Sequence, residues 1–182
     1  MQNNQATRVY TGIGSRDVPE DAYKLLQALG RKLATRGYAL RSGGAVGCDT
    51  AFYEGCKEVG GMSTIFVPWS GFNNLFGENI ISLSDMPQSL IYRAEWEARQ
   101  IHPVFDRLTQ GAKKLHTRNV FQALGEDLGK PSDFLVCYAP VMGNTVRGGT
   151  KTAVELAKVY GIPVYNVFDS KDRLRVELFV QD

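Results

Sequence analysis

The sequence has few of the residues that form disulfides or bind transition metals: it contains three cysteines and two histidines in 182 residues. Three is an odd number, and Cys48, Cys56 and Cys137 form no C-x-x-C pair, which argues against a disulfide framework. His102 and His116 do not lie near a cysteine at zinc spacing. We therefore expect a cytoplasmic protein with no metal site and no bound cofactor.

Long apolar runs and a strong charge excess are also missing. No stretch approaches the roughly 20 apolar residues that a membrane span needs, so we expect no membrane partner. The polar N-terminal segment Met1–Arg8 lacks the apolar core of a signal peptide, so we do not expect secretion. The net charge is only +2, whereas duplex-DNA binders usually carry a strong basic stripe. Bulk charge therefore favours no partner, although a local anion site remains open.

The sequence instead alternates predicted strands with predicted helices. The strands are expected at Arg8–Ile13, Tyr38–Arg41, Thr64–Pro68, Asp133–Tyr138 and Val164–Val167. The helices are expected at Pro19–Gly37, Cys48–Val59, Pro87–Gln100, Thr117–Leu124 and Thr152–Tyr160. This order predicts one Rossmann-like α/β nucleotide-binding domain over residues 1–182, with a doubly wound, mostly parallel sheet and helices on both faces.

Two other segments are less regular. Trp69–Asp85 is rich in Gly, Asn and Ser and is predicted as a long loop. The tail Leu174–Val180 alternates apolar and polar residues, which predicts an edge strand or a short helix.

Three segments, Thr11–Arg16, Ser42–Asp49 and Arg147–Glu155, place small residues between a strand and a helix. Glycines at such turns let the backbone approach a ligand, and the free N–H groups of the following helix bind anions. One glycine-rich turn alone can be merely a tight connection, but two of them in one doubly wound pattern favour a shared phosphate-binding crevice. The expected ligand-binding residues are Gly14, Ser15, Arg16, Ser42, Gly43, Gly44, Asp49, Arg147, Gly148, Gly149, Thr150, Lys151 and Thr152.

Two common nucleotide motifs are absent. Gly148–Thr152 looks superficially like a Walker sequence but has the wrong glycine spacing, and Gly12–Gly14 is not continued as G-x-G-x-x-G. A P-loop ATPase and a classical NAD dehydrogenase are therefore disfavoured.

The motifs resemble those of the SMF/DprA–LOG superfamily of Rossmann-like nucleotide-binding proteins, from about Val9 to Val167. Gly12–Arg16 and Arg41–Asp49 are similar to the GSR and SGGA.G.D pattern of DprA. Arg147–Glu155 resembles the P-G-G-x-G-T-x-x-E signature of the Lonely Guy phosphoribohydrolases, and Leu115–Asn119 resembles their M-H-x-R-K segment. The chain departs from that signature at two positions: Arg147 replaces the proline, and Lys151 replaces the third glycine.

The Lonely Guy resemblance implies hydrolysis of the N-glycosidic bond of a nucleoside 5′-monophosphate. Its catalytic residues would be Glu155, which would stabilise an oxocarbenium-like transition state, and Arg118, which would anchor the ligand or assist the leaving group. The alternatives are a solvated acid near a helix N-terminus for Glu155 and a plain surface arginine for Arg118.

Two further functions remain open. Arg147 and Lys151 add cations that suit a non-catalytic binder, which would sense or sequester an ADP-ribose-like or cyclic nucleotide. The front half suggests instead a DprA-like protein that binds single-stranded DNA. Since the superfamily commonly forms dimers, we expect a homodimer, with the helix Pro87–Gln100 as a candidate contact.

Four other side chains have two interpretations each. Asp49 could bind a ribose or base hydroxyl, or cap the helix that follows Gly47. Asn166 ends a strand at the expected ligand edge. Trp69 and Phe72 could stack on a base, or they could pack in the core.

Overall fold

The computed structural model describes residues 7–182. Most of the polar segment Met1–Arg8, on which the expectation of no signal peptide depends, therefore lies outside the described residues. No helix within residues 7–182 is both long and apolar enough to cross a membrane.

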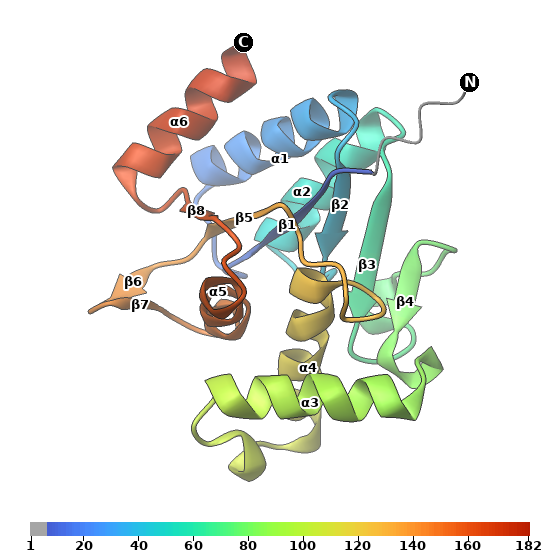
Figure 1. Ribbon diagram of the computed structural model, residues 1–182. Helices are drawn as coiled ribbons and strands as arrows, with labels where there is room; N and C mark the ends of the chain where they lie inside the picture. The colour runs from blue at the N-terminus through green and yellow to red at the C-terminus, as the bar shows by residue number, and fades with distance from the viewer. Residues whose placement is uncertain (1–6) are drawn as a thin grey trace.

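Six parallel strands form the central sheet, in the order β4-β3-β2-β1-β5-β8 (Figure 1). Their bounds are β1 Val9–Gly14, β2 Ala39–Ser42, β3 Ser63–Val67, β4 Ile80–Ser82, β5 Phe134–Tyr138 and β8 Val164–Asn166. The chain proceeds from β1 outward to β4, then returns to β5 on the other side of β1. The strand order therefore reverses between β1 and β5, and the expected doubly wound α/β fold is confirmed.

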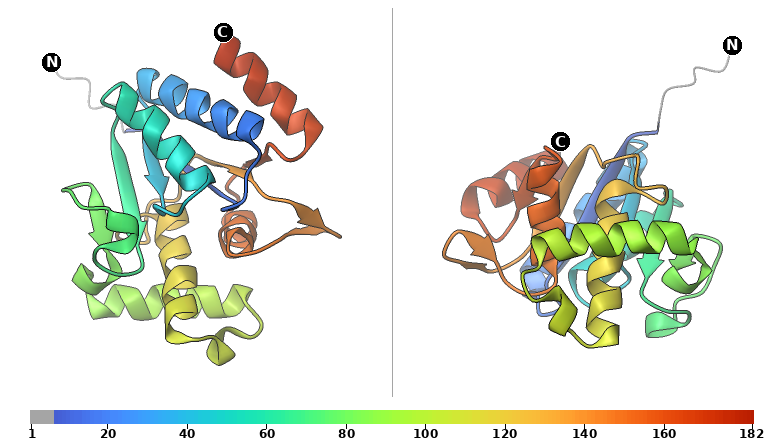
Figure 2. Two further views of the ribbon diagram at one scale, coloured as in Figure 1. Left: turned by 180° about the vertical axis from the view of Figure 1, so that it is seen from behind. Right: turned by 60° about the horizontal axis from the view of Figure 1, so that its bottom comes forward.

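Helices cover both faces of this sheet. Figure 2 shows α1, α2 and α6 in blue, teal and red on one side, with α3 and α4 in yellow-green and gold on the other. The helix bounds are α1 Glu20–Thr35, α2 Cys48–Glu58, α3 Gln88–Ile101, α4 Gln110–Leu124, α5 Thr150–Val159 and α6 Ser170–Gln181. Short 3-10 turns occupy Phe72–Asn74, Leu83–Asp85 and Phe105–Arg107, and a small antiparallel hairpin joins β6 Val141–Met142 to β7 Thr145–Val146.

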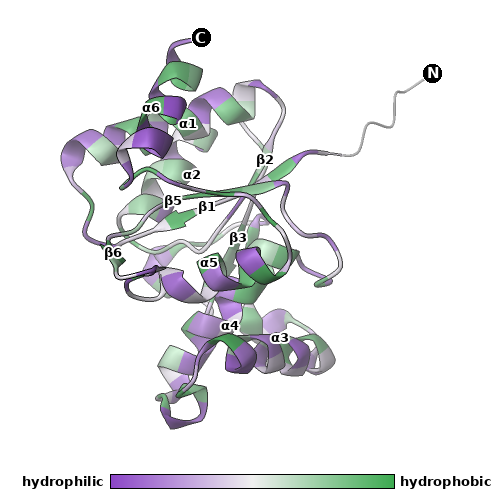
Figure 3. Ribbon diagram, turned by 60° about the vertical axis from the view of Figure 1, so that its left-hand side comes forward, coloured by the Kyte–Doolittle hydropathy of each residue, from purple (hydrophilic) through white to green (hydrophobic). Residues whose placement is uncertain are grey.

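The central strands β1 and β5 are largely buried on both faces, as is typical of a parallel sheet. Ile65 and Val67 of β3 pack with α1 and α2, whereas Phe66 between them packs with α3, α4 and α5. Figure 3 shows hydrophobic, green stretches along the strands and a mixture of green and purple along the surrounding helices. The period-2 alternation of strand side chains thus supplies two cores, one on each side of the sheet.

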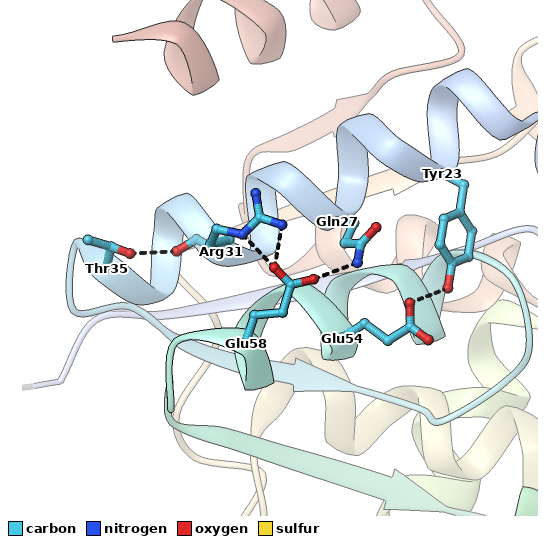
Figure 4. Close-up of polar contacts among 6 residues, drawn as sticks. All are labelled: Tyr23, Gln27, Arg31, Thr35, Glu54 and Glu58. Atoms are coloured by element: carbon cyan, nitrogen blue, oxygen red, sulfur yellow. Dashed lines mark hydrogen bonds and ion pairs between the residues drawn. The ribbon is translucent and has the colours of Figure 1, made fainter.

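The contact between α1 and α2 has a polar border (Figure 4). Tyr23 donates its hydroxyl hydrogen to Glu54 at 2.7 Å, and Gln27 donates to Glu58 at 2.6 Å. Arg31 forms an ion pair with the same Glu58 carboxylate. These groups are largely exposed, so they orient the two helices more than they stabilise them.

The structure corrects two expectations and, for the tail, selects the helix from the two alternatives. The predicted loop Trp69–Asp85 contains β4, whose three residues are too few to show an alternation and which forms by pairing with β3. The tail Leu174–Val180 lies within α6, which Asp169 caps by accepting bonds from two backbone N–H groups. The helix predicted from Thr117 begins at Gln110, because the Thr109 hydroxyl caps it through the Ala112 N–H.

Candidate functional site

A cavity of about 510 Å³ opens where the carboxyl ends of β1 and β5 meet. Its walls come from the end of β1 and the following loop (residues 13–17), the loop and first turn of α2, one face of α4, and the turn 147–150. This is the switch point of the strand order, where open α/β sheets bind their ligands. The fold therefore brings two of the three predicted turns, and part of the third, to one cavity.

Arg118 lies in the wall of this cavity and is only 7% exposed. Its Nη1 donates to the carbonyl oxygen of Gly43 at 2.7 Å, its Nη2 donates to Asn119 at 3.3 Å, and its guanidinium lies 5.8 Å from the centre of the Phe72 ring. Within residues 7–182 its Nε has no hydrogen-bond partner. Burial lowers the Arg118 pKa, and Asp49 opposes that shift. The surface-arginine interpretation was therefore wrong.

Asp49 also lines this cavity and is 3% exposed. Its Oδ2 accepts a hydrogen bond from the N–H of Ala45 at 3.2 Å, so it closes the loop before α2 rather than capping the helix. Burial raises the Asp49 pKa to about 6, against the opposite effect of Arg118. Asp49 is thus a structural partner of the loop as well as a cavity residue.

The other residues of the first turn pack inside the protein. Ser42 is fully buried and donates its hydroxyl hydrogen to the carbonyl oxygen of Gly12 at 2.6 Å. A Cβ at Gly43 would lie 2.8 Å from both the Arg118 guanidinium carbon and Asp49 Oδ2, and Gly44 has a φ of +64°. Ser42, Gly43 and Gly44, which we expected to bind the ligand, do not line the cavity.

The second turn opens onto the cavity. Gly148 and Gly149 line it, and no described atom lies within 4 Å of a Cβ built on either. Gly149 is the N-cap residue of α5 and makes no side-chain cap, so the first turn of that helix begins at this cavity; the Lys151 N–H is bonded to the Gly148 carbonyl oxygen at 3.1 Å. Arg16 lines the cavity from the loop after β1, and Arg147 and Thr150 line it from the second turn.

Lys151 and Glu155 share a different face of α5. Glu155 accepts hydrogen bonds from Thr145 at 3.2 Å and from Lys158 at 2.9 Å, and it lines a separate hollow together with Lys151. Glu155 lies five positions after Thr150, which places it about 140° away around a helix of 3.6 residues per turn. The structure therefore does not bring Glu155 and Arg118 together.

Three polar residues of α4 were missed by the sequence reasoning. His116, Asn119 and Gln122 line the cavity with Arg118. Asn119 donates to the carbonyl oxygen of Gly149 at 2.8 Å, which links α4 to the second turn. Gln122 is 1% exposed, and both of its amide atoms lack a partner among the described residues. The available signals were the resemblance of Leu115–Asn119 to the M-H-x-R-K segment, and the spacing of three between Asn119 and Gln122 in the predicted helix.

His116 holds Thr152 rather than leaving it free for a ligand. Its Nδ1 lies 2.7 Å from Thr152 Oγ1, and Thr152 is 1% exposed. Burial, followed by His102 and Arg118, lowers the His116 pKa to about 4, so the ring is neutral near pH 7. Asn166 also has a structural role, because its amide exchanges two hydrogen bonds with the backbone of Ala139.

Comparisons with known proteins show the family and the fold of this chain. Residues 2–93, half of the chain, match the family model described as DNA recombination-mediator protein A, and this stretch contains Gly12–Arg16 and Arg41–Asp49. No curated protein matches the chain.

Solved structures share the fold. The DNA processing protein A (DprA) from Streptococcus pneumoniae is 16% identical, with a TM-score of 0.55 over 87% of this chain and 49% of that chain. TM1055, a structural genomics target, is 17% identical, with a TM-score of 0.53 over 87% and 72%. The molybdenum cofactor carrier protein from Chlamydomonas reinhardtii is 20% identical, with a TM-score of 0.51 over 86% and 74%.

Proposed function

Because this chain belongs to the DNA recombination-mediator protein A family, and hence to the expected superfamily, we propose that it binds a phosphate-bearing nucleotide unit in the cavity between β1 and β5. The unit is either a free nucleotide or one residue of a single-stranded nucleic acid. The family membership favours the strand, and the chemistry of the cavity suits both.

One observation carries this proposal: at the cavity wall, buried polar groups of Arg118 and Gln122 have no hydrogen-bond partner within residues 7–182. An unsatisfied buried polar group costs about 1–3 kcal/mol, so native proteins rarely retain one without a reason. A ligand with several acceptors and donors would give these groups their missing partners after a small rearrangement of the side chains.

The cavity also has the charge and backbone geometry that a phosphate needs. The first turn of α5 carries backbone N–H groups, and two glycines precede it. No described atom lies within 4 Å of a Cβ built on either glycine. Arg16 and Arg147 flank this position and can each form charge-assisted hydrogen bonds. The acids in the lining are Asp17 and Asp49, and Asp49 is already bonded to the loop.

Calorimetry with thymidine 5′-monophosphate and with thymidine tests the proposal. We expect the monophosphate to bind at least about tenfold more tightly, because only it carries the phosphate. Arg118→Gln should lose most of this affinity, whereas the same change at the exposed Arg93 of α3 should not. Equal affinity for both ligands, or an unaltered Arg118→Gln variant with a native circular dichroism spectrum, would overturn the proposal.

Hydrolysis of an N-glycosidic bond is a finer proposal that the geometry supports less well. It needs a carboxylate at the sugar, and Glu155 lies on the face of α5 that points away from the cavity. Binding without turnover is therefore the function that we favour, including a sensing or sequestering role. Recovery of intact monophosphate after incubation supports binding alone, whereas release of free base that Glu155→Gln abolishes would establish the hydrolase.

A further inference from the structure

Aromatic rings gather on the segment that follows β3. Trp69 is 40% exposed and Phe76 is 74% exposed, while Phe72 between them is buried. Trp69 contacts Phe72 edge to face, with ring centroids 5.3 Å apart and planes at 85°. Phe72 thus contacts one side of the indole, and part of the Trp69 surface faces solvent.

This segment adjoins the cavity. Asn73 donates its side-chain N–H to the carbonyl oxygen of Gly44 at 2.9 Å, next to the cavity residue Ala45. Trp69 lies beside Gly111, next to Ala112 in the lining, because a Cβ on Gly111 would be 3.9 Å from the indole. The exposed indole is therefore at the border of the cavity, between α4 and the first turn.

The backbone of the segment is fixed in an unusual shape. Gly71, Asn73 and Asn74 all have left-handed φ angles, of +75°, +49° and +57°. Backbone hydrogen bonds from Phe72 to Trp69, from Asn74 to Gly71 and from Leu75 to Phe72 hold the turns. Such strain persists where the surroundings determine the conformation, so the rings are presented in a defined position rather than on a mobile loop.

We propose that residues 69–76 form a base-stacking platform, so that the ligand is a single-stranded nucleic acid with one nucleotide in the cavity and its neighbour on Trp69, with Phe76 as a further stacking ring. This inference rests on the proposed function. Proteins that bind single strands combine cationic grooves with aromatic rings, and the arginines at 16, 118 and 147 supply the cationic part here. A mononucleotide in the cavity would leave the platform empty.

The chain has two tryptophans, Trp69 and Trp96, which makes the platform directly observable. Trp96 lies on the exposed side of α3 and does not line the cavity. In a Trp96→Phe variant the remaining fluorescence reports Trp69 alone, and an oligothymidylate of about eight nucleotides should quench it through stacking. In a Trp69→Phe variant the same titration should leave the Trp96 fluorescence unchanged.

Affinity separates this inference from the proposed function. Trp69→Leu keeps apolar bulk against Phe72 but removes the ring, so it should weaken oligothymidylate binding about tenfold, within the range of lost base stacking. Phe76→Leu should weaken it less, and Tyr92→Leu on the exposed face of α3 is the matched control. Thymidine 5′-monophosphate should bind wild type and Trp69→Leu equally.

Unchanged oligonucleotide affinity in Trp69→Leu, or no quenching in Trp96→Phe, would overturn the platform and leave the nucleotide site standing. Failure of wild type to bind either ligand would overturn both.

Discussion

The glycines of the first turn, Ser42–Asp49, pack against protein, whereas those of the second turn, Arg147–Glu155, face open space. A Cβ at Gly47 would lie 2.5 Å from two backbone carbonyl oxygens, but one at Gly149 would meet no described atom within 4 Å. Both turns have the same sequence pattern, in which a strand is followed by small residues and then by a helix. The difference shows that one pattern can serve either close packing or access for a ligand.

The two turns are coupled through α4. Arg118 bonds to the carbonyl of Gly43 in the first turn, and Asn119 bonds to the carbonyl of Gly149 in the second. The first turn thereby sets the position of the buried guanidinium, and the second turn provides the proposed anion site. Mutations in the two turns should therefore divide between stability and binding.

The largest effect is expected at Gly47, whose φ of +87° and close backbone neighbours exclude a side chain. Gly47→Ala should lower the free energy of unfolding by about 3 kcal/mol, since strain and overpacking add. Urea denaturation measures this loss. A stable Gly47→Ala variant would contradict the packing role of the first turn.

The next largest effect is expected from the buried carboxylate of Asp49, whose contribution to the free energy of unfolding depends on pH. Its folded pKa of about 6 lies above the ordinary 3.8 because of burial, so the folded state binds the proton more tightly. The stability from this group is complete below about pH 3.8 and is lost as pH rises through about 6.

Relative to Asp49→Asn, wild type should therefore lose on the order of 2 kcal/mol between pH 4 and pH 7. Denaturation of both proteins at several pH values checks this. Parallel pH profiles would show that the carboxylate is not buried as described.

Gly149→Ala tests the open turn. Gly149 has helical angles of −61° and −28°, so alanine fits and the free energy of unfolding should change by less than about 0.5 kcal/mol. The added methyl group would project into the space for the phosphate, and we expect about tenfold weaker binding of thymidine 5′-monophosphate. Wild-type affinity in this variant would place the phosphate elsewhere.

The smallest effect is expected for Arg147→Gln at the cavity border. Its guanidinium is exposed, with one contact to the sulfur of Met142. Binding of a short oligothymidylate should weaken about threefold. The slope of log affinity against log salt concentration should fall by about the contribution of one phosphate contact. Titrations at several salt concentrations check this, and an unchanged salt slope would remove Arg147 from the phosphate site.

Much of the fold could be predicted because it depends on local patterns. The apolar run of β5 and the glycines at the ends of β1 and β2 are visible in the sequence. These patterns predict the parallel sheet. β4 could not be predicted, since its three residues form a strand only by pairing with β3. The start of α4 was missed because the cap at Thr109 precedes a segment with little apolar periodicity.

The site was predicted in part for a similar reason. Spacing located both turns, and the structure places Gly14–Arg16 and Arg147–Thr150 around one cavity. Spacing could not reveal that Glu155 is rotated away from that cavity, or that Gln122 reaches it from a helix distant in sequence. Those facts depend on how α5 and α4 pack. The homodimer stays a prediction.

The most direct test of the central claim is to record the backbone amide resonances of the isotope-labelled protein during titration with thymidine 5′-monophosphate. The account predicts the largest shifts at Gly148, Gly149 and Thr150, with further shifts at Ser15 and Arg16 and small ones at Gly43 and Gly44. Shifts centred on Gly43 and Gly44 with an undisturbed start of α5, or shifts away from the cavity altogether, would contradict it.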